Sequence, residues 1–356
     1  MLKIGIIGLG QAGKTTLFRI LTHAHGSGLG SGRPEAHVGV VHVPDARLGR
    51  LKEMYQPKKT VYASIEYVDT AGSVIDLARA GAQTASLREM DALMHVVRIF
   101  DNPGGDLTAA KNDIESVELE LILSDLAVVE KRLERLEKDI KKQKSPALQK
   151  EWDVLQASKA ALDKQTPLRE VARTPEEERL IRGFTFLSSK PMLYVLNLSE
   201  QDAARANAAE DFAHQTGLKQ RPKTGVSAVC GQVEAELSEL ADAEAAEFLA
   251  SYGLKESAVA RLIRSSYGLL GLISFFTVGE DECHAWTIRA GTSAVEAAGE
   301  IHSDLQKGFI RAEVVRYDDL IAAGSLAEAR NRGQLKLEGK EYVLADGEIM
   351  HVRHSG

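Results

Sequence analysis

A glycine-rich stretch near the N-terminus has the residue types and the spacing of a phosphate-binding loop. Residues 8–15 have the sequence GLGQAGKT, which satisfies the pattern GxxxxGK[ST]. Glycines let such a loop turn its backbone N–H groups toward phosphate oxygens, and the start of the next helix adds partial positive charge. Lys14 is then expected to reach the β- and γ-phosphates, and the Thr15 hydroxyl to bind Mg²⁺. The predicted nucleotide-binding residues of this loop are Gly10, Gln11, Ala12, Gly13, Lys14, Thr15 and Thr16.

The same glycines also fit a second class of site. Gly8, Gly10 and Gly13 have the spacing GxGxxG of a dinucleotide-binding fold, which needs a strand ending in Asp or Glu about 20 residues further on. Residues 23–32 have the sequence HAHGSGLGSG, which contains neither an apolar strand nor a carboxylate. The phosphate loop is therefore the favoured interpretation.

An aspartate follows the next candidate strand. Residues 61–68 alternate well enough for a strand and are followed by Asp69-Thr70-Ala71-Gly72. Asp69 is expected to hold Mg²⁺ through water, and the Gly72 N–H to sense the γ-phosphate. The alternative is an ordinary turn that contains an Asp and a Gly. We predict that Thr15 and Asp69 form the metal site and that Lys14 and Gly72 act in catalysis.

A third segment has the features of a base-recognition loop. The near-continuous apolar run over residues 191–196 predicts a strand buried on both faces, and Asn197-Leu-Ser-Glu200 follows it. GTPases usually place NKxD here. The longer acid and the missing lysine favour adenine or a relaxed specificity. The nucleotide-binding residues predicted in this part of the chain are Asn197, Leu198 and Glu200, with Cys230 and Gly231 after the next buried segment.

The composition is that of a cytoplasmic protein kept in a reducing environment. The chain has 356 residues and a net charge of −7, so any nucleic-acid contact must come from a local patch, and we expect no DNA partner. The two cysteines form no CxxC pair. We expect neither a signal peptide nor a membrane span.

The middle of the chain predicts an antiparallel helical hairpin inserted into the nucleotide domain. Residues 130–150 hold eight Lys or Arg against four acids. This basic tip is a candidate contact for RNA phosphates, and a solvated helix face with i,i+4 ion pairs explains it equally well. The seam that predicts the first helix consists of Ile122, Leu126, Val129, Leu133, Leu136 and Ile140.

Taken together, these residues resemble the Obg-like ATPase (YchF) family of translation-factor-class P-loop proteins. The resemblance covers nearly the whole chain. It implies a C-terminal TGS domain, which is a small β-grasp module, a preference for ATP over GTP, and association with the ribosome or ribosomal RNA. Besides the motifs above, the matching segments are residues 41–48, 56–60, 88–97, 233–237, 284–288, 301–305, 307–313 and 346–351.

Several segments depart from the family pattern. Arg33 occupies the place of a threonine that precedes His37 and the next strand in the family. Ser73 follows the DTAG motif where the family has a hydrophobic residue, residues 75–83 replace a longer glycine-rich run, and residues 101–106 lack a histidine proposed to act in hydrolysis. These departures predict intact nucleotide binding and altered hydrolysis.

The resulting prediction is an α/β protein. A P-loop domain with a mostly parallel sheet spans residues 1–112 and 180–268, the hairpin residues 113–179, and the TGS-like domain residues 271–356. The expected function is hydrolysis of ATP to ADP and phosphate by a ribosome-associated regulator of translation or stress response, with Mg²⁺ and, as a further candidate, K⁺. The alternatives are a GTPase of the same family and a nucleotide-gated ribosome- or RNA-binding adaptor with little hydrolysis.

Overall fold

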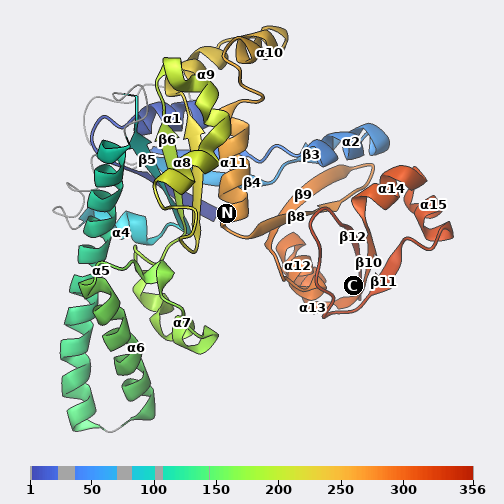
Figure 1. Ribbon diagram of the computed structural model, residues 1–356. Coiled ribbons are helices and arrows are strands. Elements are labelled where there is room, and N and C mark those ends of the chain that lie inside the picture. The colour runs from blue at the N-terminus through green and yellow to red at the C-terminus, as the bar shows by residue number, and fades with distance from the viewer. Residues whose placement is uncertain (1, 23–36, 70–81, 101–106, 144, 356) are drawn as a thin grey trace. The chain divides into compact units, whose positions relative to one another are not determined.

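The computed structural model describes residues 2–22, 37–69, 82–100, 107–143 and 145–355 (Figure 1). The chain divides into two compact units. The first contains Met1–Val40 and Glu66–Ser265, and the second Val41–Ile65 and Ser266–Gly356. Residues 41–65, which the sequence analysis assigned to the nucleotide domain, therefore group with the C-terminal part of the chain. The three-domain division by residue number stays a prediction.

The first unit is built on a six-stranded sheet with the order β2-β4-β1-β5-β6-β7. The pairs β1–β5, β5–β6 and β6–β7 are parallel. All residues of β6 are buried, as expected of a strand covered on both faces. The strands are β1 (Leu2–Ile7), β2 (His37–His42), β4 (Ser64–Asp69), β5 (Ala92–Arg98), β6 (Met192–Asn197) and β7 (Thr224–Val229).

Helices connect and cover these strands. The long helix α5 (Thr108–Lys142) begins in the core of the sheet, where Ile114, Val117 and Leu121 pack with residues of β5 and β6. The other helices of this part of the chain are α1 (Lys14–Thr22), α4 (Ala82–Arg88), α7 (Pro175–Ile181), α8 (Ala209–Gln215), α9 (Gly231–Leu237), α10 (Asp242–Ser251) and α11 (Ala258–Leu269), with 3-10 turns η1 (Leu168–Glu170), η2 (Arg182–Phe184) and η3 (Glu200–Ala208).

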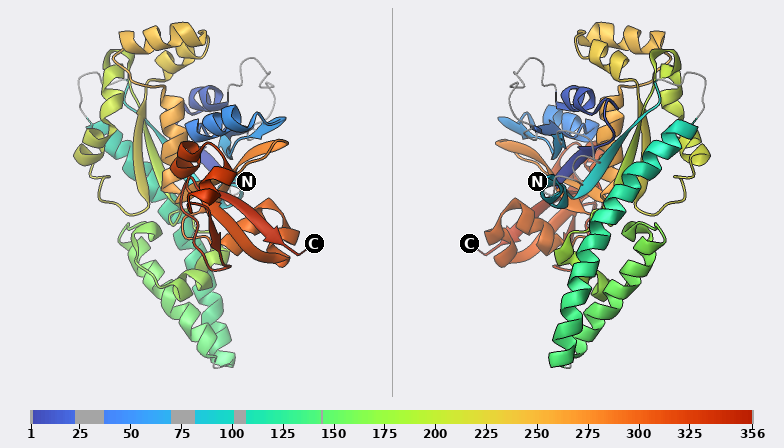
Figure 2. Two further views of the ribbon diagram at one scale, coloured as in Figure 1. Left: turned by 90° about the vertical axis from the view of Figure 1, so that its right-hand side faces the viewer. Right: turned by 90° about the vertical axis from the view of Figure 1, so that its left-hand side faces the viewer.

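Beyond the sheet, α5 pairs with α6 (Pro146–Asp163) in the predicted helical hairpin (Figure 1, Figure 2). Ile122, Val129, Leu133 and Leu136 of the seam are buried, and Leu126 and Ile140 pack against them. Both views of Figure 2 show the two helices side by side. The α/β fold with an inserted hairpin is therefore confirmed.

The second unit contains a mixed six-stranded sheet with the order β11-β10-β12-β8-β9-β3. β3 joins it by parallel pairing with β9, which explains why residues 41–65 belong to this unit. Ala294, Ala297 and Ala298 of α12 pack into the core of this unit with Phe275 and Val314. The elements are α2 (Ala46–Tyr55), β3 (Lys59–Val61), β8 (Leu272–Thr277), β9 (Glu282–Arg289), α12 (Ala294–Ile301), α13 (Ser303–Lys307), β10 (Phe309–Val315), α14 (Tyr317–Ala323), α15 (Leu326–Asn331), β11 (Lys336–Glu338) and β12 (Ile349–His354).

Among the helices of the described ranges, we find none with the length and apolar character needed to cross a bilayer.

Candidate nucleotide site

The glycine-rich loop joins β1 to α1, and two of its glycines are required by close packing. Gly8 has a φ of 150°, and a Cβ there would lie 2.6 Å from the carbonyl oxygen of Val96 on β5. Gly13 has a φ of 96°, and a Cβ there would collide with the side chain of Asn197. Gly10 differs, because no described atom lies within 4 Å of such a Cβ. The middle of the loop is therefore open to the approach of a ligand.

Lys14 is the first residue of α1, and its side chain returns over the loop. Its Nζ donates to the carbonyl oxygens of Leu9 at 2.7 Å and of Gly8 at 3.2 Å. The ammonium group therefore lies beside the loop backbone, where phosphate oxygens bind in this type of loop.

Thr15 and Asp69 come from different elements and meet directly. The Thr15 Oγ1 donates a hydrogen bond of 2.9 Å to Asp69 Oδ2. Asp69 is only 2% exposed, and its Oδ1 has no hydrogen-bond partner among the described residues. A buried carboxylate oxygen without a partner is costly unless a cation or a donor reaches it.

These two side chains fit the chemistry of Mg²⁺. The Thr15 hydroxyl donates its proton to Asp69, so its lone pairs remain free for a cation. Mg²⁺ prefers oxygen ligands, and it commonly takes one or two from the protein and the rest from water and phosphate. The described ranges contain no cluster of three or more His, Cys, Asp or Glu that could hold a metal without such help.

Asn197 connects the phosphate loop to the segment that follows β7. Its Nδ2 donates to the Ala12 carbonyl oxygen at 3.1 Å, and its Oδ1 accepts from the Gly231 N–H at 3.1 Å. The residue is 8% exposed. Three of the predicted segments are thus brought together by one buried amide. Thr16 lies near the same place, because its Cγ2 is 3.8 Å from the position of a Cβ on Gly231.

The remaining residues of the predicted base-recognition loop have different environments. Glu200 is exposed, and the Tyr252 hydroxyl donates to its Oε1 at 2.7 Å. This hydrogen bond, with some burial, raises the pKa of Tyr252 to about 12. The Leu198 side chain lies in the core of the sheet, so a contact with a nucleotide would use its backbone. Cys230 is buried, and burial raises the pKa of its thiol.

His95 is a buried residue behind the loop that sequence reasoning did not select. It lies on β5, and its Cδ2 is 3.6 Å from the position of a Cβ on Gly8. Neither ring nitrogen has a partner among the described residues. Burial, and then the charges of Lys14 and Arg169, lower its pKa to about 3, so the ring is neutral. A histidine within an otherwise apolar strand is the sequence signal for such an environment.

A buried polar cluster connects this strand to the hairpin. The ring of His95 is 5.6 Å from that of Tyr194 on β6. The Tyr194 hydroxyl donates to Glu118 on α5, and Glu118 also forms an ion pair with Arg169 of η1. The base of the hairpin is therefore anchored to the sheet by charge as well as by apolar packing.

Some predicted residues lie outside the described ranges. These are Gly72, Arg33, Ser73 and residues 101–106. His37 is described: it is the first residue of β2, and its ring centroid is 6.3 Å from that of Phe18.

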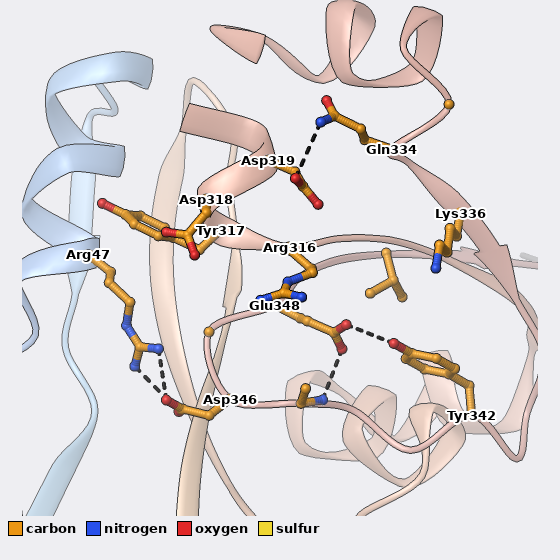
Figure 3. Close-up of a pocket in the computed structure, with 14 residues that line it drawn as sticks. Arg47, Arg316, Tyr317, Asp318, Asp319, Gln334, Lys336, Tyr342, Asp346 and Glu348 are labelled. Carbon is orange, nitrogen blue, oxygen red and sulfur yellow. Dashed lines mark hydrogen bonds and ion pairs between the residues drawn. The ribbon is translucent and has the colours of Figure 1, made fainter. Parts of the chain in front are cut away.

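The second unit has a separate pocket of about 660 Å³ (Figure 3). At one side of it, Arg47 of α2 donates to Asp346 at 2.8 Å and to its neighbour Asp45. Its guanidinium group also lies 5.2 Å from the centre of the Phe276 ring. Glu348 is buried at another side and accepts from the Tyr342 hydroxyl at 2.7 Å. The Arg47–Asp346 contact holds α2 to the turn before β12.

The fold and the site define a class of protein. A sheet with parallel pairing along β1, β5, β6 and β7, a glycine-rich loop after its first strand, a Lys-Thr pair at the start of the next helix, and an aspartate bonded to that threonine are typical of P-loop nucleotide-binding proteins.

Comparison with known proteins specifies the family. The chain is 41% identical to the protein named ribosome-binding ATPase YchF of Bacillus subtilis (strain 168), over 99% of each chain. It is 37% identical to the protein of the same name from Escherichia coli O157:H7, over 98% of each. A family model named YchF-GTPase_C, described as a protein of unknown function (DUF933), matches residues 272–355. The chain belongs to the YchF family, which confirms the resemblance inferred from the sequence.

A solved structure agrees with this assignment. The structure of the Schizosaccharomyces pombe YchF GTPase is similar to this fold with a TM-score of 0.82 and 29% sequence identity. The match covers 99% of this chain and 97% of the other.

Proposed function

We propose that this protein binds a nucleoside triphosphate with Mg²⁺ at residues 10–16 and hydrolyses it to the diphosphate and phosphate. The hydrogen bond between Thr15 and the buried Asp69 is the observation that carries the proposal, because it places two oxygen ligands beside the phosphate loop. The relatives named ATPase and the solved relative named GTPase support triphosphatase activity.

Catalysis would rest on positioning and on neutralising charge. Thr15 and Asp69 would hold Mg²⁺, which would supply positive charge to offset the negative charge of the phosphates. Lys14 would exchange its hydrogen bonds to Gly8 and Leu9 for phosphate oxygens, which carries its charge to the reacting group. Neutral His95 adds no charge behind the loop. Gly72 is proposed to contact the γ-phosphate through its N–H, as its place after Asp69 predicts.

We propose ATP as the preferred nucleotide. Glu200 replaces the shorter aspartate that is typical of GTPases. The Tyr252 hydroxyl holds the Glu200 carboxylate, so this carboxylate would meet a nucleotide base at a different place from the carboxylate of an aspartate. The curated relatives are named ATPases, and this supports the same choice.

We also propose that the protein associates with ribosomes in the cytoplasm and regulates translation or the response to stress. This proposal is supported by the relatives from Bacillus subtilis and Haemophilus ducreyi, which are named ribosome-binding ATPases. The C-terminal unit would be the TGS domain that the family resemblance implies, and K⁺ is proposed as an additional cofactor.

Nucleotide titration tests the first part of the proposal. Dissociation constants for ATP and GTP are measured by calorimetry with Mg²⁺ present, and we expect tighter binding of ATP. Tighter binding of GTP would overturn the ATP assignment while leaving the site intact. Lys14→Ala is expected to lower turnover at least about 100-fold. Lys3→Ala, at the other end of β1, is the matched control and should keep its turnover.

The altered segments around Arg33, Ser73 and residues 101–106 favour one alternative, a nucleotide-gated adaptor with little hydrolysis. Single-turnover hydrolysis, measured with and without ribosomes and K⁺, distinguishes this adaptor from the proposed triphosphatase. Turnover that ribosomes do not stimulate, and that Lys14→Ala does not reduce, would replace the enzyme with the adaptor.

A further inference from the structure

Four cations form a continuous row on the outer face of α5. They are three to four residues apart, so they share one face of a helix in which successive residues turn by about 100°. The row extends over about 16 Å of the helix axis. It lies on the opposite side of α5 from the buried seam residues Val129 and Leu133, and all four residues are exposed. We call this row the basic stripe: Lys131, Arg135, Lys138 and Lys142.

Ion pairing separates the stripe from four other cations of the hairpin. Arg132 pairs with Glu151 at 2.7 Å, and Lys141 with Glu137 at 2.6 Å. Within the part of the chain that the structure describes, the side chains of the four stripe residues form no ion pair or hydrogen bond. The other paired cations are Lys150, which contacts Glu176, and Lys159, which contacts Glu130 and Asp163. The structure therefore distinguishes four cations that are paired with acids from the four stripe cations, which are presented to solvent.

The stripe contributes little net stability to its helix. Lys131 and Arg135 are separated by four residues, as are Lys138 and Lys142, and like charges at this spacing destabilise a helix slightly. The acids of the same segment lie on the flanks of the row, with Glu134 on one side and Asp139 on the other. Glu134 lies four residues before Lys138, and Asp139 four residues after Arg135, and opposite charges at this spacing offset the repulsion, so the net effect of the row on helix stability is small.

We propose that the basic stripe is a contact surface for the phosphate backbone of RNA. The proposal rests on the proposed ribosome association, because it names the surface and the chemistry of that contact. The stripe supplies local positive charge on a chain whose net charge is −7, and phosphate contacts need such a local concentration.

The composition of the stripe favours RNA over a protein partner. Protein interfaces are depleted in lysine and enriched in aromatic residues at their centres. Three of the four stripe residues are lysines, and the exposed large apolar residues of the described ranges all lie outside residues 131–142. Contacts of this kind position a protein on RNA without reading its sequence.

The experiment compares two variants of equal charge in the full-length protein. The stripe variant carries Lys131→Gln, Arg135→Gln, Lys138→Gln and Lys142→Gln. The control variant carries Arg132→Gln, Lys141→Gln, Lys150→Gln and Lys159→Gln, which remove four paired cations of the same hairpin. Binding to a fluorescein-labelled RNA stem-loop and to purified ribosomes is measured between about 50 and 200 mM KCl.

We expect the plot of log affinity against log salt to lose about 3 units of slope in the stripe variant, and less than about 1 in the control. A charge-conserving variant with Lys131→Arg, Lys138→Arg and Lys142→Arg should bind as the wild type does, which shows that the charge and not the lysine side chain is needed; an ATP affinity equal to that of the wild type shows that the stripe variant is folded. Equal slopes in the stripe and control variants would overturn the proposal. Loss of ribosome binding with unchanged RNA binding would also overturn it, because the partner would then be a ribosomal protein.

The outcomes for the stripe and for the proposed function can be told apart. ATP affinity and basal hydrolysis should be the same in the stripe variant and the wild type, because no stripe residue lies at the nucleotide site. One outcome separates them: the wild type binds the RNA with a salt dependence that the stripe variant loses, but the wild type binds no ribosomes. In that case the stripe proposal stands and the ribosome association fails.

Discussion

The side-chain amide of Asn197 and the backbone of Gly231 are joined by a hydrogen bond of 3.1 Å, while the other end of the same amide holds the carbonyl of Ala12. One buried side chain thus fixes the phosphate loop relative to the start of α9. The nucleotide site is therefore positioned by a contact that needs no nucleotide.

Replacing this amide should loosen the loop. Asn197→Ala leaves a buried N–H and a buried carbonyl without partners, so we expect a loss of about 1–3 kcal/mol in the free energy of unfolding. Nucleotide affinity should fall as well. Urea denaturation and calorimetric titration measure the two effects. Asn207→Ala removes an exposed amide that bonds to Gly253 and is the control. Equal losses in the two variants would contradict the bridging role of Asn197.

The Asp69 carboxylate should control the response to magnesium. Asp69→Asn keeps an acceptor for the Thr15 hydroxyl and removes the negative charge, so the protein should keep its fold. We expect the wild type to bind ATP more weakly when EDTA removes Mg²⁺, and the variant to bind ATP with nearly the same affinity in both conditions. A variant that still gains affinity from Mg²⁺ as strongly as the wild type would exclude Asp69 from the metal site.

Burial of His95 should make the protein less stable in mild acid. Its pKa is lowered to about 3, whereas an unfolded histidine has a pKa of about 6.5. Below pH 6.5 the unfolded chain therefore binds a proton that the folded chain does not. The free energy of unfolding should fall with decreasing pH, by up to about 1.4 kcal/mol per pH unit from this group, until the pH reaches the folded pKa.

The variant His95→Phe isolates this contribution, because phenylalanine is apolar and cannot titrate. Urea denaturation at several pH values between about 7 and 4 should show a shallower decline for the variant than for the wild type. His354→Phe, at an exposed position of β12, is the control and should follow the wild type. Parallel curves for His95→Phe and the wild type would contradict a buried neutral ring.

The length of the Glu200 side chain should influence the choice of base. Glu200→Asp restores the shorter acid typical of GTPases and withdraws the carboxylate from Tyr252. We expect the ratio of GTP to ATP affinity to rise by about 10-fold, which corresponds to about 1.4 kcal/mol. The exposed pair Lys219–Glu210 offers a control in Glu210→Asp. An unchanged ratio in Glu200→Asp would remove Glu200 from base recognition.

In the second unit, Arg47 should contribute to stability more than a neighbouring arginine. Arg47 contacts Asp45, Asp346 and Phe276, and Arg47→Ala removes all three contacts. Because Asp346 is half-exposed, we expect a modest loss of about 1–2 kcal/mol in the free energy of unfolding. Arg50→Ala on the same helix removes only an exposed pair with Glu53 and should change little. Thermal denaturation of both variants measures the difference.

Local residue patterns determined much of the nucleotide site. The glycine spacing and the Lys-Thr pair predicted a phosphate loop between β1 and α1, and the structure has Lys14 at the start of that helix. The apolar run before Asn197 predicted a buried strand, and every residue of β6 is buried. These features were accessible because backbone geometry and burial over short segments depend on residue type and spacing.

Contacts between distant segments were decided only by the tertiary structure. Nothing in residues 41–65 indicates that β3 pairs with β9, because strand pairing over more than 200 residues has no local signal. The same is true of Tyr252, which follows α10, packs against the core of the sheet and donates to Glu200, 52 residues earlier in the chain.

The hairpin has features of both kinds, some determined by local sequence patterns and some only by tertiary contacts. Its heptad spacing determined two paired helices, because an apolar seam must find a partner to be buried. The charge pattern alone left two interpretations open, an RNA contact and a face of internal ion pairs. Pairs such as Lys141–Glu137 follow from the i,i+4 spacing, but the folded arrangement decides which cations pair across the hairpin, since that depends on where α6 and α7 place Glu151 and Glu176.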